Sequence, residues 1–145
     1  MTAMNEQDKH AFLNEMRRGG EIYQAEVWGT VTADKKTQAM FSSLPSRMAL
    51  ADVYAYIGMS EENINIVAVN TQKPDVILGR MRLPFEKITS AEIHNSLIPG
   101  RKTVDLMVEG RAVRLRFTGS TVGTDLQNQK EGIRKIADRL KAMYH

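Results

Sequence analysis

The sequence predicts an α+β domain that is mainly β: an open barrel or sandwich of about seven antiparallel strands, capped by a C-terminal helix and preceded by an extra short helix. Two observations support this class. Between residues 20 and 118 several runs alternate apolar and polar side chains, and short turns separate them, as in consecutive antiparallel strands. After residue 124 apolar side chains recur at three- and four-residue spacing, as in a helix packed on a core.

The composition fits one folded domain. The chain has 145 residues, 42% of them hydrophobic and 26% charged, which is ordinary for a globular protein. The net charge of +3 is spread over 20 basic and 17 acidic residues, whereas a nucleic-acid binder usually concentrates positive charge on one face. Cysteine is absent, which excludes disulfides, thiolate metal sites and cysteine nucleophiles. With no evident signal peptide or membrane span, we expect a cytoplasmic protein.

The first predicted element is a short helix over residues 5–17. Phe12 and Met16 are four residues apart and form a narrow apolar stripe. Asn5 can cap the helix, and the Gly–Gly pair at 19–20 ends it. We favour a helix that covers a sheet, because amphipathic helices are mostly packed inside their own domain. The alternative is an arm that binds a partner or a second copy.

A long strand is predicted over residues 21–32. Trp28 falls on the face opposite to the apolar one, and we expect a loop or the first helix to cover it, since large aromatic side chains are mostly buried. The alternative is an exposed aromatic contact for a ligand. The side chains predicted to share the apolar face are Tyr23, Ala25, Val27 and Val31.

The next segment, residues 33–47, is predicted to be a long loop, because Pro45 disfavours a continuing strand. A helix over 46–57 competes with a strand through "DVYAYIGM", residues 52–59. We prefer the strand, because "SEEN" resembles a hairpin turn and "INIVAVN", residues 64–70, follows as a clear second strand.

Two more strands are predicted before the last hairpin. The turn "TQKPD" at 71–75 leads into a strand over 76–83, and "FEKI" at 85–88 is a short link. The following strand covers 88–97, and the Pro–Gly pair at 99–100 indicates the next turn.

The stretch "LMVEGRAVRLRF", residues 106–117, defines a hairpin with Glu109 and Gly110 as its two-residue turn. A shift of one residue would bury the arginines, so the alternation fixes the register. Arg114 then has a cross-strand partner, Asp105, and needs no ligand to explain it. The predicted pairs are Val108 with Arg111, Leu106 with Val113 and Val104 with Leu115, then Asp105 with Arg114 and Thr103 with Arg116.

The last element is a helix over residues 125–144. Thr124 and Gln127 match a capping box. Gly132 weakens the helix but permits close packing on a sheet. The predicted apolar stripe contains Leu126, Ile133, Ala137, Leu140 and Tyr144, with Ile136 and Met143 beside it.

Several of these runs resemble a known family. "LPFEKITSAEIHNSLIPGRKTVDLMVEGRAVRLRF", the later "NQKEGIRKIADRLKAMY" and "YIGMSEENINIVAVN" are similar to the bacterial pleckstrin-homology-like (PH-like) domains, related in fold to GRAM domains. The resemblance covers residues 20–144. It implies a PH-like open barrel of about seven antiparallel strands in 20–145, capped by the C-terminal helix, with 1–19 as an N-terminal helical extension. It also implies a homo-oligomer, because members of this fold group self-assemble.

The resemblance suggests one weak ligand site. Pleckstrin-homology domains that bind phosphoinositides use basic residues in the loops at the open end, where several cations can converge on phosphate. The usual lysine followed by a spaced Arg-x-Arg is absent, and charge runs mostly solvate a surface. The candidate ligand-binding residues are Lys35, Lys36, Lys73 and Arg111.

No catalytic constellation is evident. His10, His94 and His145 are the only histidines, and we expect His94 to be a solvated strand residue beside Glu92. Neither a G-x-S-x-G motif nor a phosphate-cradling glycine loop is present. We therefore expect no enzyme activity, no metal and no cofactor. Aromatic content is only 6%, which leaves little for base stacking, so we expect no specific nucleic-acid binding. The arginines that could form a basic stripe are Arg80, Arg82, Arg114 and Arg116.

The sequence thus indicates a noncatalytic binding or scaffolding domain, engaged in protein–protein contact or self-association. An exposed sheet edge and the first helix are the expected contacts. One alternative is an adaptor that binds a membrane surface or anionic lipid. Another is nonspecific binding of nucleic acid.

Overall fold

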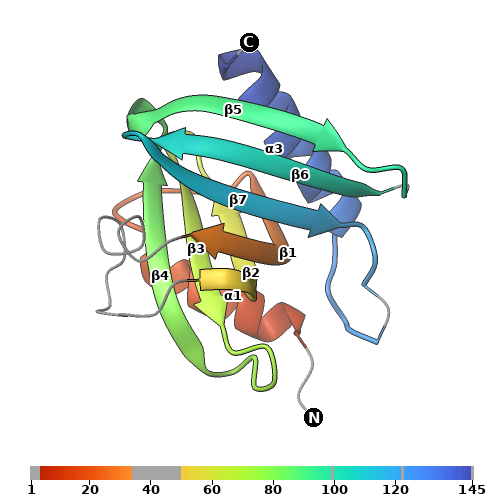
Figure 1. Ribbon diagram of the computed structural model, residues 1–145. Helices are drawn as coiled ribbons and strands as arrows, with labels where there is room; N and C mark the ends of the chain where they lie inside the picture. The colour runs from red at the N-terminus through yellow and green to blue at the C-terminus, as the bar shows by residue number, and fades with distance from the viewer. Residues whose placement is uncertain (1–3, 34–49, 99, 122, 145) are drawn as a thin grey trace.

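The computed structural model describes residues 4–33, 50–98, 100–121 and 123–144. Its seven strands form one antiparallel sheet in the order β4-β3-β2-β1-β7-β6-β5. Within the described residues β4 and β5 end this order, so the sheet is not closed (Figure 1). The arrangement confirms the mainly β class and fits a PH-like fold in general. The elements are α1 Glu6–Met16, β1 Ala25–Ala33, β2 Leu50–Met59, β3 Asn63–Val69, β4 Ile77–Pro84, the 3-10 turn η1 Phe85–Lys87, β5 Ile88–Asn95, β6 Arg101–Val108, β7 Arg111–Thr118 and α3 Gln129–Met143.

Most strand predictions are confirmed. The competition between a helix over 46–57 and a strand over 52–59 is decided for the strand, since β2 pairs with β1 and β3. Nearly all of the loop predicted for 33–47 lies outside the described residues. The start of the first strand was wrong: β1 begins at Ala25. Residues 21–24 instead belong to the connection from α1, because side chains of this segment are engaged in polar contacts with other elements.

The register of the last hairpin is confirmed for every predicted pair, from Val108 opposite Arg111 to Thr103 opposite Arg116. Its turn residues both have left-handed backbone, with φ 52° at Glu109 and 83° at Gly110. Two successive residues of this kind match the twist of a tight hairpin. The alternation of apolar and polar side chains and the conformation of the turn residues therefore favour the same register.

The main core lies between the inner face of the sheet and α3, which contacts β1 and β5. Ile133, Ile136 and Leu140 are buried there with inward side chains of the strands. Gly132 allows the close approach that the sequence predicted, because a methyl group at this position would overlap the side chain of Val27. Met143 is wrongly placed in the predicted stripe, since it is exposed at the end of the helix.

The start of the last helix was also wrong. The capping box does not form: α3 begins at Gln129, and Thr124 accepts instead from the N–H of Leu126. Residues 125–128 are held against the start of α1, where Asp125 Oδ1 accepts from the N–H of Glu6 at 2.9 Å. Glu6 Oε1 accepts in return from the N–H of Gln127 at 2.9 Å. These contacts between distant segments outweigh the local helix signal. Leu126 belongs to a second buried cluster, with Leu13 and Tyr56, rather than to the apolar stripe of α3.

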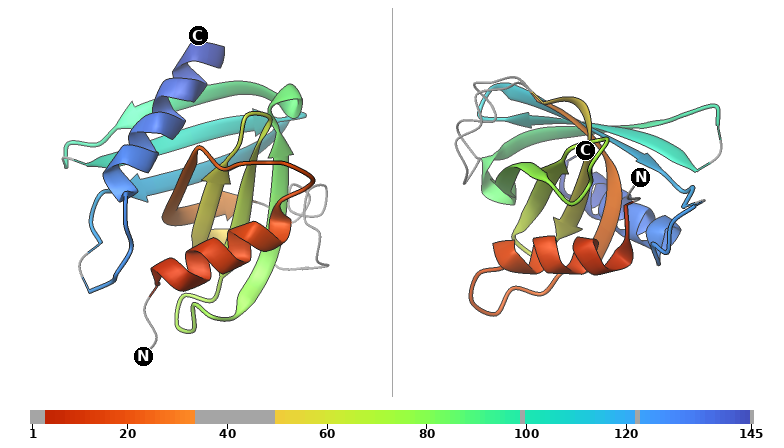
Figure 2. Two further views of the ribbon diagram at one scale, coloured as in Figure 1. Left: turned by 180° about the vertical axis from the view of Figure 1, so that it is seen from behind. Right: turned by 90° about the horizontal axis from the view of Figure 1, so that it is seen from below.

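Helix α1 covers the outer face of the sheet and contacts β1, β2 and β3 (Figure 2, left). Leu13 is fully buried, and the ring of Phe12 meets that of Tyr56 edge to face at 5.9 Å. Burial raises the pKa of Tyr56 to about 12, although its hydroxyl accepts from the N–H of Asn5. β3 is buried along its whole length, because its apolar side chains belong in part to the main core and in part to the cluster that packs against α1. The covering role predicted for α1 is confirmed, and its apolar stripe is used inside the domain.

Candidate functional site

The predicted ligand-binding cations do not gather at one place in the described part of the chain. Lys73 lies in the turn before β4, and Arg111 opens β7. The turn beside Arg111 contacts η1, which follows β4, through Glu109 N–H and Lys87 O at 3.2 Å. An eight-residue strand spans roughly 25 Å, so these two cations are near opposite ends of β4 (Figure 1). Lys35 and Lys36 lie outside the described residues. That these four bind a ligand stays a prediction.

The predicted cross-strand pair of Arg114 and Asp105 is confirmed. Arg114 donates to Asp105 Oδ1 at 2.6 Å and to Oδ2 at 3.3 Å across the strands. The hydrogen bond from Arg114 lowers the pKa of Asp105. His94 is exposed, as predicted, and its Nε2 lies 3.3 Å from Asp105 Oδ2. This group accounts for Arg114 without a ligand.

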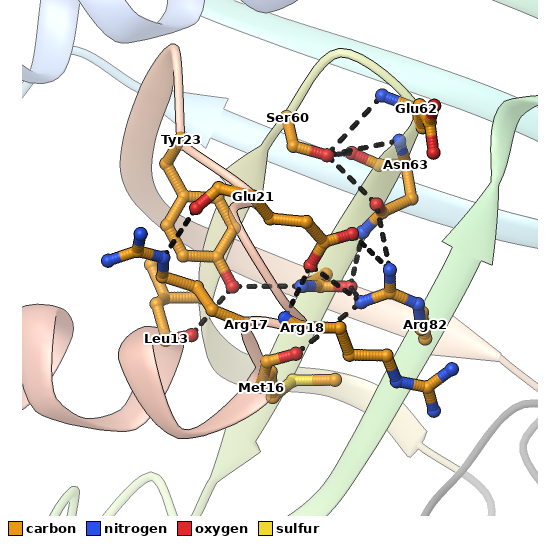
Figure 3. A network of polar contacts seen from close by, with 11 residues as sticks. Leu13, Met16, Arg17, Arg18, Glu21, Tyr23, Ser60, Glu62, Asn63 and Arg82 are labelled. Atoms are coloured by element: carbon orange, nitrogen blue, oxygen red, sulfur yellow. Dashed lines mark hydrogen bonds and ion pairs between the residues drawn. The ribbon is translucent and has the colours of Figure 1, made fainter.

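Arg82, one of the four arginines that could form a basic stripe, is engaged in contacts within the protein. Its guanidinium forms a two-pronged ion pair with Glu21, in the connection from α1 to β1, and Nη1 lies 3.0 Å from Glu21 Oε1 (Figure 3). It also donates to Met16 O and to Asn63 Oδ1. Glu21 Oε1 accepts in addition from the N–H of Arg18 at 2.9 Å. The pair therefore holds the connection from α1 against β3 and β4.

A chain of buried amides continues this network (Figure 3). Ser60 donates to Asn63 Oδ1 at 2.8 Å, and Asn63 Nδ2 donates to Asn65 Oδ1 at 2.6 Å. Asn65 Nδ2 donates to the hydroxyl of Tyr23, which donates to Leu13 O at 2.6 Å. Burial raises the pKa of Tyr23. The amides of Asn63 and Asn65 are thus hydrogen-bonded to neighbouring side chains, and the network links the outer face of the sheet to α1. We call this network, together with the pair of Arg82 and Glu21, the joint.

The joint predicts a loss of stability in acid. The hydrogen bond from Arg82 lowers the pKa of Glu21 below its ordinary value. A carboxyl whose pKa is lower in the folded state contributes stability above its unfolded pKa, about 4.3, and loses it as the pH falls through the folded pKa. We expect the free energy of unfolding, measured by urea titration, to fall from about pH 5 downward. In Glu21→Gln the fall should be smaller; an identical pH profile in both proteins would contradict the assignment.

Among the described residues, no group of three or more His, Cys, Asp and Glu side chains is placed to hold a metal ion. Of the hollows on the described surface, two lie against the β2–β3 turn and share Glu61 and Glu62. Ser60 also lines the first of them, but its hydroxyl donates to Asn63 Oδ1 at 2.8 Å. The absence of catalysis stays a prediction.

Leu97, the most exposed apolar side chain among the described residues, and its neighbour Ile98 lie at the turn between β5 and β6. We call the residues Ser96, Leu97, Ile98 and Gly100 the β5–β6 tip. Leu97 is fully exposed and Ile98 is 51% exposed. The turn projects beyond the rest of the molecule in every view (Figures 1 and 2). The sequence missed this feature, because the predicted strand over 88–97 included Leu97, whereas β5 ends at Asn95.

The tip is closed by its own hydrogen bonds. Ser96 N–H donates to Arg101 O at 3.1 Å, and Arg101 N–H donates to Ile98 O at 3.3 Å. Ile98 N–H donates to Ser96 Oγ at 3.1 Å. Backbone groups that are already paired cost little to move out of water. The tip can therefore enter an apolar environment without breaking its backbone bonds.

Cations follow the tip directly. Arg101 and Lys102 begin β6, and Lys102 Nζ reaches Asn95 Oδ1 at 2.6 Å. Gly119 N–H donates to Gly100 O at 2.9 Å, and the side chain of Lys130 lies against Gly119. We call Arg101, Lys102 and Lys130 the basic cluster. The sequence contains no Asp or Glu in 95–102 or in 117–121, so the strand ends beside the tip carry only positive charge.

Comparison with known protein families finds no match, and comparison with curated proteins finds none either. Among solved structures the chain is similar to one described as the hSac2 domain from human phosphoinositide phosphatase Sac2. The TM-score is 0.51 and the sequence identity 14%, over 96% of this chain and 82% of that chain. At this identity the similarity concerns the fold alone.

None of the described helices is both long enough and apolar enough to cross a bilayer.

Proposed function

We propose that this chain is a noncatalytic binding domain of the PH-like kind, and that it docks on anionic membrane surfaces through the β5–β6 tip. The observation that carries the proposal is the exposure of Leu97 and Ile98 at a projecting turn beside the basic cluster. Two aliphatic side chains in water are unfavourable, and here they occupy the most extended point of the hairpin.

The combination of a convex apolar tip and cations behind it fits a bilayer interface. The aliphatic groups enter the boundary between headgroups and acyl chains, while the cations stay at the level of the lipid phosphates and carboxylates. A negatively charged leaflet attracts each nearby Lys or Arg. The basic cluster lies at the same end of the hairpin as the tip, so charge and shape favour the same occupant.

This surface differs from the loop site suggested by the family resemblance. Arg101 lies opposite Thr118, whereas Arg111 lies at the other end of the same hairpin, opposite Val108. The proposal therefore replaces the weak cation group with a site at the opposite end of β6 and β7.

Self-association remains a second prediction, but through a sheet edge rather than through α1. The apolar stripe of α1 packs on the sheet, whereas β4 and β5 each have one strand neighbour among the described residues. Light scattering of the purified chain is the measurement; a single monomeric mass at all concentrations would contradict self-association.

The test is cosedimentation of the full chain with vesicles. We expect binding to phosphatidylcholine vesicles that contain about one third phosphatidylserine, and little binding to phosphatidylcholine alone. Binding should weaken as salt rises above about 0.1 M, because screening reduces the attraction of the cations. Leu97→Ser with Ile98→Ser should reduce the affinity at least about tenfold, since insertion strength scales with buried apolar area.

Ile22→Ser is the matched control, because Ile22 is 72% exposed but lies in the connection from α1 to β1, outside the tip. It should bind vesicles like the unchanged protein. Absence of vesicle binding at low salt, or equal binding by the tip variant and the control, overturns the proposal. Loss of a multimer in the tip variant, without any vesicle binding by the unchanged protein, would assign the tip to a protein contact instead.

A further inference from the structure

A hollow of about 400 Å³ lies on the outer face of the sheet, and residues of β1, β2, β6 and β7 line it. We call it the aromatic hollow, because Trp28 and Tyr54 form part of its wall. Their rings meet edge to face, with centroids 5.7 Å apart, a favourable geometry for an aromatic pair. The cover that the sequence predicted for Trp28 is partial: its Nε1 donates to Ser120 O at 3.3 Å, while the side chain is only half-buried.

The aromatic hollow lies level with the strand ends from which the β5–β6 tip projects. Gln129 Nε2 donates to Trp28 O at 2.8 Å and to Thr118 O at 2.9 Å, so these two backbone positions are neighbours. Thr118 lies opposite Arg101 in the pairing of β6 with β7, and Ser96 N–H donates to Arg101 O at 3.1 Å. Trp28, the end of β7 and the first residue of the tip are therefore at one level along the strands.

The apolar side chains of the tip lie a short distance beyond this level. Leu97 and Ile98 follow Ser96 directly in the chain. At about 3.3 Å per residue of extended chain, their backbone lies about 3–7 Å further out than Trp28. The polar layer on each side of a bilayer has a similar depth of about 5–7 Å. When the tip reaches the boundary of the acyl chains, the aromatic hollow is thus at the level of the lipid headgroups.

The aromatic side chains suit that level. Trp and Tyr are the side chains that concentrate at the interface between membrane and water, because each combines an apolar ring with a polar group. Arg101 belongs to the basic cluster and also lines the aromatic hollow, so the hollow and the tip are parts of one continuous surface.

We propose that the membrane contact extends from the β5–β6 tip to the aromatic hollow, with Trp28 and Tyr54 among the lipid headgroups while Leu97 and Ile98 enter the acyl boundary. The inference rests on the proposed membrane docking and adds the orientation of the docked domain. The tip end of the hairpin points toward the bilayer, and the outer face of β1 at Trp28 is turned to the lipid.

The first test uses the fluorescence of Trp28, the only tryptophan of the chain. The probes are phosphatidylcholine vesicles with about one third phosphatidylserine, labelled with a nitroxide either on the headgroup or near the end of the acyl chains. A nitroxide quenches tryptophan emission only at short range. We expect the emission to shift to shorter wavelength on unlabelled vesicles, and to lose more intensity with the headgroup label than with the deep label.

The second test compares two aromatic variants by cosedimentation with the unlabelled vesicles. Trp28→Ala should weaken binding at least about threefold, because insertion strength scales with the apolar area that enters the interface. Tyr144→Ala is the matched control. Tyr144 is also half-buried, but its hydroxyl donates to Phe85 O in η1, beside the Glu109 turn at the opposite end of the hairpin. It should bind like the unchanged protein, and thermal unfolding checks that both variants fold.

The outcomes separate this inference from the tip proposal. Vesicle binding without quenching of Trp28, stronger quenching by the deep label, or equal affinities of the two folded variants overturns the inference and leaves docking by the tip in place. Equal binding and equal quenching in the unchanged protein and in the variant with Leu97→Ser and Ile98→Ser overturn the tip proposal and leave the aromatic hollow as the contact. Absence of vesicle binding overturns both. The quenching measurement needs no variant, so it decides the inference even where Trp28→Ala fails to fold.

Discussion

Gln129→Ala is expected to lower the free energy of unfolding by about 3 kcal/mol, a large effect for the loss of one polar side chain. β1 pairs with β7 only from Thr30 to Ala33, so the two strands have separated at Trp28. The buried amide of Gln129 fills this gap: Nε2 donates to Trp28 O at 2.8 Å and to Thr118 O at 2.9 Å, while Oε1 accepts from Trp28 N–H. Removal leaves three backbone groups without these partners.

Urea unfolding of the variant measures the effect. Gln127→Ala is the matched control, because Gln127 is exposed and its contacts with α1 use its backbone. The control should change the free energy of unfolding by less than about 0.5 kcal/mol. Equal stability of the two variants would show that water replaces the Gln129 amide without cost, contrary to its assigned role.

The second large effect is expected at Lys9, which is 1% exposed although it carries a charge. Its Nζ lies 2.8 Å from Glu6 Oε1 and donates to Gln127 O at 3.1 Å and to Glu26 O at 3.3 Å. Burial raises the pKa of Glu6, but the hydrogen bonds from Lys9 and from Gln127 N–H outweigh it, and the net shift is downward. Lys9→Ala should lower the free energy of unfolding by about 3 kcal/mol, since it removes the buried cation from the partly buried Glu6 carboxylate, which then keeps only His10 and the N–H of Gln127 among the described contacts.

Two comparisons make this prediction specific. Lys9→Met fills similar space without charge, so it should cost less than Lys9→Ala. In a double-mutant cycle, Glu6→Gln should reduce the cost of Lys9→Ala, because the carboxylate with which Lys9 pairs is gone. Lys135→Ala, at an exposed cation of α3, is the control and should have little effect. A Lys9→Ala protein as stable as this control would contradict the role of Lys9 as a buried link between α1, β1 and the segment before α3.

The sequence was informative wherever structure depends on neighbouring residues. Alternation and the Glu109–Gly110 turn gave the register of the last hairpin, and the Phe12–Met16 stripe gave the packing of α1. It was misleading where distant contacts outweigh local preference. The capping signal at Thr124 yields to hydrogen bonds between residues 125–127 and α1. Arg82, a candidate for a basic stripe, is the partner of Glu21.

The candidate surfaces were harder to foresee than the strands and helices. Trp28 and Arg116 line one hollow only because β1 lies beside β7, a neighbour relation that no local pattern specifies. The tip had one local signal, two aliphatic residues directly before a Pro–Gly pair, but the alternation placed Leu97 inside a strand. The predicted cations were selected by family resemblance, and the structure spreads Lys73 and Arg111 apart.

The central claim is that the β5–β6 tip contacts the membrane. The most direct measurement is nuclear magnetic resonance of isotope-labelled protein on anionic vesicles that carry a spin label within the acyl chains. The account predicts that amide signals of residues 96–98 and 100–102 lose intensity first, while those around Lys73 and Arg111 are retained. Preferential loss around Arg111 or Lys73, or no loss at the tip, would contradict it.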